Sequence, residues 1–131
     1  MKVHHIGYLV KDLSNAIRNF ECLGYHLINS ICNDSLRGVD ICFLQNESTC
    51  VELVSPHKGN LDFKSIQKKV GNGPYHICYV TDDFLNNIKD FENQEGWLMI
   101  KKPQEAPAID NRKVVFFYNS DIGIVEILES K

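Results

Sequence analysis

The stretch HHIGYLVKDLSNAIRNF, residues 4–20, recurs in the second half of the chain as YHICYVTDDFLNNIKDF, residues 75–91. The two copies align without a gap, so that His5 of the first copy corresponds to His76 of the second. A match of this length at a fixed spacing is typical of a duplicated structural unit, and it decides the fold class of the whole chain.

Each copy has the pattern of one strand, one helix and three further strands. Residues 3–10 are rich in β-branched and aromatic side chains, which predict a strand. Asp12 then offers an N-cap to a helix with apolar residues at helical spacing, and Gly24 ends that helix. The other expected elements are strands 25–32, 38–45 and 49–55 in the first copy, and strand 75–81, helix 83–94 and strands 97–101, 113–118 and 122–129 in the second. This order predicts an α+β fold of curved sheets.

The length and composition of the chain predict one domain. Its 131 residues, of which 44% are hydrophobic, are enough for one sizeable core. We expect a first module over about residues 1–56, a connector over 57–73 that contains a short helix, and a second module over 74–131.

Charge and cysteine content narrow the class of partner and the compartment. The net charge is −3 and no basic stripe interleaves with aromatic residues, so no nucleic-acid partner is expected. No apolar run is long enough for a signal peptide or a membrane span, so no membrane association is expected. The five cysteines form no C-x-x-C pair and suit reduced thiols in a cytoplasmic protein. A small molecule is the expected partner.

The repeat distinguishes between the two adjacent histidines. In a strand, His4 and His5 point to opposite faces. His4 corresponds to Tyr75 in the second copy, whereas His5 corresponds to another histidine, His76. A single strand histidine is more often a core or rim residue than a ligand, so the repetition selects His5 and His76 as candidates.

Two glutamates are repeated in the same way. Glu52 interrupts the apolar run CVELVSP, and Glu126 interrupts the run GIVEILE. An ionised carboxylate among core-type neighbours is costly unless it is paired or bound to a metal, although a glutamate on a half-exposed strand is also ordinary. Two imidazoles and two carboxylates are ligands of the kind that bind nickel, cobalt, zinc or manganese.

The segments HHIGYLVKDL, CVELVSP, YHICYV and GIVEILE resemble the four metal-ligand strands of the vicinal oxygen chelate superfamily. This group includes glyoxalase I, methylmalonyl-CoA epimerase, extradiol dioxygenases and bleomycin-resistance proteins. The resemblance covers essentially the whole chain and is strongest to short bacterial glyoxalase I-like and epimerase-like members. It implies paired βαβββ modules that form a U-shaped curved sheet around one divalent metal, with ligands His5, Glu52, His76 and Glu126.

The same resemblance implies an activity. In the glyoxalase I pattern, a metal-dependent isomerase or lyase moves a proton next to a carbonyl through a metal-bound enediolate. The catalytic residues would be Glu126 and Glu52. The substrate would be a small carbonyl compound carried as a thiol or CoA conjugate, and Arg112 and Arg37 are candidates for holding its anionic tail. A homodimer is also expected, because two small sheets leave strand edges exposed.

Two alternatives stay open. The epimerases carry an acidic residue shortly before a glycine in the third strand, where this chain has Leu36, with Asp34 as the nearest acid. This difference weakens an epimerase function without excluding it. The other alternative is a metal-free module that binds drugs or other small molecules between its sheets. The aromatic residues that would line such a cavity, or else belong to the core, are Tyr8, Tyr79, Phe117 and Tyr118.

Overall fold

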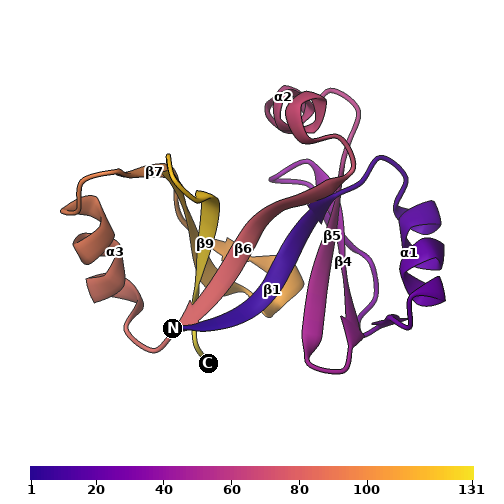
Figure 1. Ribbon diagram of the computed structural model, residues 1–131, viewed down its shortest axis with the longest axis horizontal. Coiled ribbons are helices and arrows are strands. Elements are labelled where there is room, and N and C mark those ends of the chain that lie inside the picture. Colours follow the sequence, from indigo (N-terminus) through magenta and orange to yellow (C-terminus); the bar gives the residue numbers. More distant parts are fainter. The chain divides into compact units, whose positions relative to one another are not determined.

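A computed structural model describes all residues, 1–131, and contains nine strands and three α-helices. The chain forms two compact units, one of residues 5–75 and one of residues 1–4 with 76–131. Each unit has a strand, a helix and further strands in the predicted order (Figure 1). The α+β fold of paired βαβββ modules is therefore confirmed.

The unit of residues 5–75 contains a mixed sheet with one helix on it. Its strands lie in the order β2-β4-β5-β1, with β3 also paired to β4. β1 runs parallel to β5, and β4 runs antiparallel to its three partners. The elements are β1 (Lys2–Leu9), α1 (Leu13–Cys22), β2 (His26–Leu27), β3 (Cys32–Asp34), β4 (Val39–Asn46), β5 (Thr49–Pro56) and α2 (Leu61–Val70).

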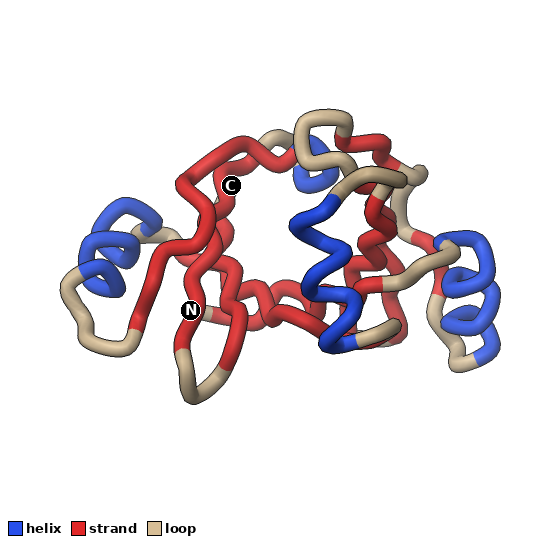
Figure 2. The backbone as a smooth tube through the Cα atoms, turned by 90° about the horizontal axis from the view of Figure 1, so that it is seen from above, coloured by secondary structure: helices blue, strands red, loops and turns tan.

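The second unit has the same topology. Its strands lie in the order β6-β9-β8-β7, with β6 parallel to β9 and the other pairs antiparallel. The elements are β6 (Gly73–Thr81), α3 (Phe84–Glu92), β7 (Trp97–Ala106), the 3₁₀-helix η1 (Pro107–Ile109), β8 (Arg112–Asn119) and β9 (Gly123–Glu129). Figure 2 shows the strands of each unit with its helix, α1 or α3, running alongside. The sequence repeat thus corresponds to a repeat of structure.

Two strands differ from their predicted extents. The expected strand 25–32 is broken into β2 and β3 because the side chain of Asn29 replaces a backbone partner: its Oδ1 accepts a hydrogen bond from Phe43 N at 3.0 Å. β7 extends well beyond the predicted 97–101, and its pairing with β8 shifts register on both sides of Lys101. Pro103 lies in this irregular stretch and has no N–H to donate to a ladder.

The helices cover one face of each sheet and leave the other face for different side chains. In the first unit, α1 packs on a buried cluster that includes Leu44, Val51 and Leu53. In the second, α3 packs on an equivalent cluster that includes Val125 and Ile127. Because side chains alternate along a strand, the residues between these apolar ones point to the face without a helix.

The N-cap of α1 provides a first prediction. Asp12 Oδ1 accepts a hydrogen bond from Asn15 N at 2.9 Å. Asp83 holds the corresponding position before α3, but its side chain makes no capping bond to the backbone. We expect Asp12→Ala to lower the free energy of unfolding by about 1 kcal/mol, and Asp83→Ala to lower it by clearly less. Urea denaturation of the two variants measures both losses, and equal losses would contradict the capping role of Asp12.

Candidate functional site

In the unit of residues 5–75, a histidine and a glutamate meet on the face opposite α1. Glu52 of β5 lies directly beside Gly7 of β1, and His5 lies two residues earlier on the same face of β1. Nε2 of His5 is 3.7 Å from Oε1 of Glu52. Both residues are buried, with 1% of His5 and 5% of Glu52 exposed.

The other unit contains an equivalent pair. Glu126 of β9 lies directly beside Cys78 of β6, and His76 lies two residues before Cys78 on the same face. Nε2 of His76 is 3.0 Å from Oε2 of Glu126, and each residue is 3% exposed. The two histidines and two glutamates that the repeat selected thus form two pairs with the same strand geometry.

These pairs fit a divalent metal by burial and by donor type. A buried carboxylate is strongly destabilising unless a cation or hydrogen-bond donors compensate its charge. Each pair offers one imidazole nitrogen and one carboxylate oxygen within 4 Å of each other. That combination of nitrogen and oxygen donors suits nickel, cobalt, zinc and manganese.

The thiols near Glu52 are not suited to join this chemistry. Burial, with a further contribution from the charge of Glu52, raises the pKa of Cys42 to about 12 and that of Cys50 to about 11. The nucleophile and metal ligand is the thiolate, and at neutral pH both groups stay protonated. Neither thiol therefore supplies a thiolate beside His5 and Glu52 at neutral pH.

Arg37, a predicted substrate-binding residue, is engaged by a neighbouring acid. Its Nη1 lies 3.1 Å from Oδ2 of Asp34, and its backbone N donates to Asp34 Oδ1 at 3.0 Å. The carboxylate of Asp34 is buried in this turn, whereas Leu36 is 95% exposed. The interaction offsets the charge of Arg37, and it also engages Asp34, the acidic residue nearest to Leu36 in the sequence.

Arg112, the other predicted substrate-binding residue, lies at the start of β8. Its Nε donates a hydrogen bond to the backbone oxygen of Glu129 at 2.8 Å, and the residue is half-buried. This bond joins the beginning of β8 to the end of β9. The guanidinium therefore has a structural contact.

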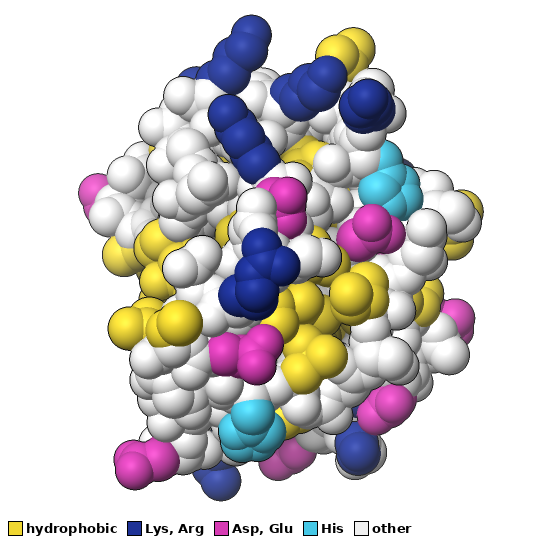
Figure 3. All heavy atoms as spheres, turned by 90° about the vertical axis from the view of Figure 1, so that its right-hand side faces the viewer, with side chains coloured by type: hydrophobic (Ala, Val, Ile, Leu, Met, Phe, Trp, Pro, Cys, Tyr) yellow, Lys and Arg dark blue, Asp and Glu magenta, His cyan; other side chains and the backbone are white.

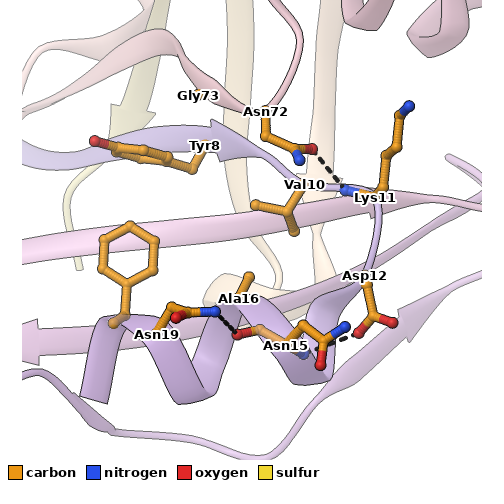
Figure 4. A pocket seen from close by; sticks show the side chains of 10 residues that line it. Tyr8, Val10, Lys11, Asp12, Asn15, Ala16, Asn19, Asn72 and Gly73 are labelled. Carbon is orange, nitrogen blue, oxygen red and sulfur yellow. Dashed lines mark hydrogen bonds between the residues drawn. The ribbon is translucent and has the colours of Figure 1, made fainter. Parts of the chain in front are cut away.

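A pocket of about 350 Å³ lies on the α1 side of β1 (Figure 4). Its lining includes the apolar side chains of Tyr8, Val10 and Phe20 and the polar residue Asn72. Tyr8 lies three positions after His5 on β1, and Val10 follows directly after the strand, five positions after His5. Odd offsets place these two side chains on the α1 side of the sheet while His5 faces the other way. This pocket is thus distinct from the His5–Glu52 pair.

The four aromatic residues considered for a drug-binding cavity lie in different surroundings, and of these four only Tyr8 lines the pocket beside α1. Phe117 is fully buried in the core beneath α3, and Tyr79 packs against the same core. Tyr8 makes an edge contact with Phe20 of α1, with ring centroids 5.1 Å apart. Tyr118 is 44% exposed. These residues were expected either to line a ligand cavity or to belong to the core, and Phe117 belongs to the core.

Two aromatic residues beside the histidines were missed by the sequence analysis. The Phe43 ring meets the ring of His5 edge-on, with centroids 5.2 Å apart. The Phe116 ring meets that of His76 in the same way, at 5.4 Å. A repeated motif, FLQN at 43–46 and FFYN at 116–119, carried a signal for them.

Basic side chains gather near α2. Figure 3 shows Lys and Arg side chains at the upper end of the face that it draws, where α2 lies, and the last turn of α2 contains Lys68 and Lys69. Cations at the C-terminal end of a helix interact favourably with the helix dipole.

No helix of the chain has the length and apolar character needed to span a membrane.

Comparison with known proteins identifies one superfamily. The sequence profile described as the Glyoxalase/Bleomycin resistance protein/Dioxygenase superfamily matches residues 4–116. No curated protein matches the sequence significantly.

Similar solved structures cover almost the whole chain. One is a hypothetical protein from Bacillus halodurans C-125, at 23% identity and a TM-score of 0.85 over 99% of this chain and 94% of that chain. A variant of methylmalonyl-CoA epimerase from Streptomyces coelicolor, in complex with 2-nitronate-propionyl-CoA, has 16% identity, a TM-score of 0.84 and coverages of 99% and 94%. The methylmalonyl-CoA epimerase of Mycobacterium tuberculosis has 18% identity, a TM-score of 0.83 and coverages of 99% and 88%. At these identities, the likeness shows a shared fold.

The raised thiol pKa values lead to a prediction about cysteine reactivity. At pH 8 we expect iodoacetamide to alkylate the exposed Cys22 of the folded protein while Cys42 and Cys50 react far more slowly. Because the thiolate is the reactive form, the rates at Cys42 and Cys50 should rise as the pH approaches about 12 and about 11. Mass spectrometry of peptides from protein alkylated while folded measures each rate. Equal rates at Cys22 and Cys42 at pH 8 would show that this account of burial is wrong.

Proposed function

Because the chain belongs to the glyoxalase/bleomycin resistance protein/dioxygenase superfamily, we propose that it is a divalent-metal-dependent enzyme that moves a proton next to a substrate carbonyl. The observation that carries this proposal is the duplication of a buried His–Glu pair at equivalent strand positions. A module that only binds drugs has no need of two such pairs, whose carboxylates are costly to bury without a cation.

The proposed metal ligands are the members of both pairs, His5 and Glu52 with His76 and Glu126. Their donor set suits one nickel, cobalt, zinc or manganese ion. When bound, such an ion supplies positive charge that stabilises the negative charge developing on the substrate oxygen during proton removal. The burial of all four residues supports this assignment, because it keeps bulk water from the carboxylates.

The two glutamates are the proposed acid and base. A carboxylate oxygen of Glu126 takes the proton from the carbon next to the carbonyl and returns it to give the product. Glu52 is the second candidate for the same role. A buried carboxylate suits this role because fixed protein groups, rather than mobile water, surround it. Neighbouring charges in such a site can also bring the pKa of a carboxyl group toward the working pH. Nε2 of His76 lies 3.0 Å from Oε2 of Glu126, so the two donor atoms are close enough to bind the same ion.

We favour a glyoxalase I-type substrate, the hemithioacetal of a 2-oxoaldehyde with a small thiol. Such a reaction is served by a single carboxylate that carries the proton between neighbouring atoms. An epimerase needs a second base, and the candidate positions argue against one: Leu36 cannot carry a proton, and the Asp34 carboxylate is held by Arg37. The alternative is nevertheless a specific one, since the similar structures include methylmalonyl-CoA epimerases with CoA ligands.

We also propose a residue that holds the substrate, a compartment and an oligomeric state. Arg112 is the better candidate for holding an anionic tail of the thiol or CoA conjugate, because the charge of Arg37 is paired with Asp34. None of the five cysteines forms a disulfide in this structure, and we propose the reducing cytoplasm as the compartment. We propose a homodimer, because each unit's sheet has edge strands that a second copy can cover.

Metal analysis tests the shared site. We expect one nickel, cobalt, zinc or manganese ion per chain after reconstitution and dialysis, measured by inductively coupled plasma mass spectrometry. His5→Ala and His76→Ala should each lower occupancy severely, because each removes one of four ligands. His26→Ala is the matched control, since His26 lies exposed on β2. Two ions per chain would mean that each pair binds its own metal, and no ion under any condition would leave the drug-binding module as the leading function.

Turnover assays test the reaction and its substrate. The metal-loaded protein should convert methylglyoxal in the presence of a small thiol, and Glu126→Gln should reduce this turnover at least a hundredfold with an unchanged circular dichroism spectrum, because an amide cannot accept the proton. Glu129→Gln is the control on the same strand. Turnover of methylmalonyl-CoA instead would select the epimerase alternative, and full activity of Glu126→Gln would refute the role of Glu126.

A further inference from the structure

Phe43 and Phe116 hold equivalent positions beside the two glutamates. Phe43 of β4 lies directly opposite Glu52 of β5, and Phe116 of β8 lies directly opposite Glu126 of β9. Directly opposite residues in an antiparallel pair point to the same face of the sheet. Each phenylalanine therefore shares a face with the His–Glu pair of its own unit.

The ring geometry shows how each phenylalanine reaches its histidine. β4 and β1 lie on either side of β5, so their backbones are separated by two strand spacings, roughly 9.6 Å. The ring centroids of Phe43 and His5 are only 5.2 Å apart, with an angle of 81° between the ring planes. The two side chains thus lean toward each other across the strand that carries Glu52.

The other unit repeats this arrangement independently. β8 and β6 flank β9, which carries Glu126. The rings of Phe116 and His76 lie 5.4 Å apart at an interplanar angle of 89°. Edge-to-face contact at this distance is a favoured arrangement for aromatic rings. Two occurrences of the same three residue types in the same register are hard to attribute to packing alone.

We infer that Phe43 and Phe116 are positioning residues that fix the imidazole rings of His5 and His76 for metal binding. This inference rests on the proposed function. The torsion that turns a histidine ring is broad and poorly restrained by itself. A phenylalanine on one side limits that rotation and keeps Nε2 on the side of the carboxylate, 3.7 Å from Glu52 and 3.0 Å from Glu126. Neither phenylalanine touches the metal in this scheme, since each acts through its histidine.

The same strands offer matched controls. Leu44 and Phe117 directly follow Phe43 and Phe116, and both are fully buried in the cores beneath α1 and α3. They face away from the His–Glu pairs because side chains alternate along a strand. A Phe117→Leu variant therefore removes an aromatic ring one residue away without changing a contact of His76.

Metal affinity provides the first test. Competition with a chromophoric chelator measures the Zn²⁺ affinity of the full chain. We expect Phe43→Leu and Phe116→Leu each to weaken this affinity by about two- to tenfold, which corresponds to the loss of one edge-to-face aromatic contact. Phe116→Tyr retains the ring and should retain the affinity. Phe117→Leu should lower the thermal midpoint and leave the affinity unchanged. Wild-type affinity in both Phe43→Leu and Phe116→Leu would overturn the inference.

The imidazole signals of the metal-free protein provide a second test that does not depend on metal binding. In ¹H–¹³C spectra, we expect Phe43→Leu to shift and broaden the ring signals of His5 while those of His76 stay in place, and Phe116→Leu to do the reverse. Unchanged signals in both variants would show that the phenylalanines do not order the rings. A wild-type chain that binds no metal would refute the proposed function, while these spectra would still decide whether the rings are positioned.

Discussion

Two carboxylates buried in the middle of apolar strands impose the strongest constraint on this molecule. Glu52 and Glu126 are 5% and 3% exposed, in runs that otherwise supply the core. An ionised group in such a place needs compensation by partners of its own. Each carboxylate has an imidazole nitrogen close by, and each histidine ring in turn rests against a phenylalanine. In each unit, the carboxylate is thus next to an imidazole, and the imidazole is next to a phenylalanine ring.

The sheets make this arrangement compatible with folding because each separates its two faces. Val51 and Leu53, which flank Glu52, pack beneath α1 and supply the hydrophobic driving force. The Glu52 side chain between them, whose carboxylate is costly to bury, points to the other face. A single strand thereby contributes to the core and to the candidate site at once, which explains why the carboxylates interrupt apolar runs and do not lie in loops.

The sequence singled out the two histidines and the two glutamates, because period-two alternation and an internal repeat both constrain the same positions. It could not reveal that Asn29 would replace a backbone carbonyl and break a strand, since that depends on a contact with Phe43 of another strand. The ion pair that engages Arg37 was missed for a different reason: it depends on the turn that brings Asp34 back to the guanidinium. Local patterns fix faces and element order, while long-range and turn contacts decide which charges are already engaged.

Comparison of the two units shows where substitution has been tolerated. On the helix side, Ala16 of α1 corresponds to Asn87 of α3, and Val10 corresponds to Thr81. Thr81 Oγ1 donates to Asn87 Oδ1 at 2.6 Å, whereas the Val10 and Ala16 side chains line the pocket. The polar residues of the second unit are tolerated at these positions because the Thr81 hydroxyl and the Asn87 amide bond to each other.

On the other face, the histidine, the glutamate and the phenylalanine are identical in both units. In the proposed metal site, a ligand cannot be exchanged for a residue of similar volume, because its donor atom and its orientation are what matter. The phenylalanine is apolar, so packing alone would permit leucine or valine in its place, as it permits Leu44 in one unit where the other has Phe117. Its identity in both units therefore reflects the requirement of the histidine ring for an aromatic neighbour.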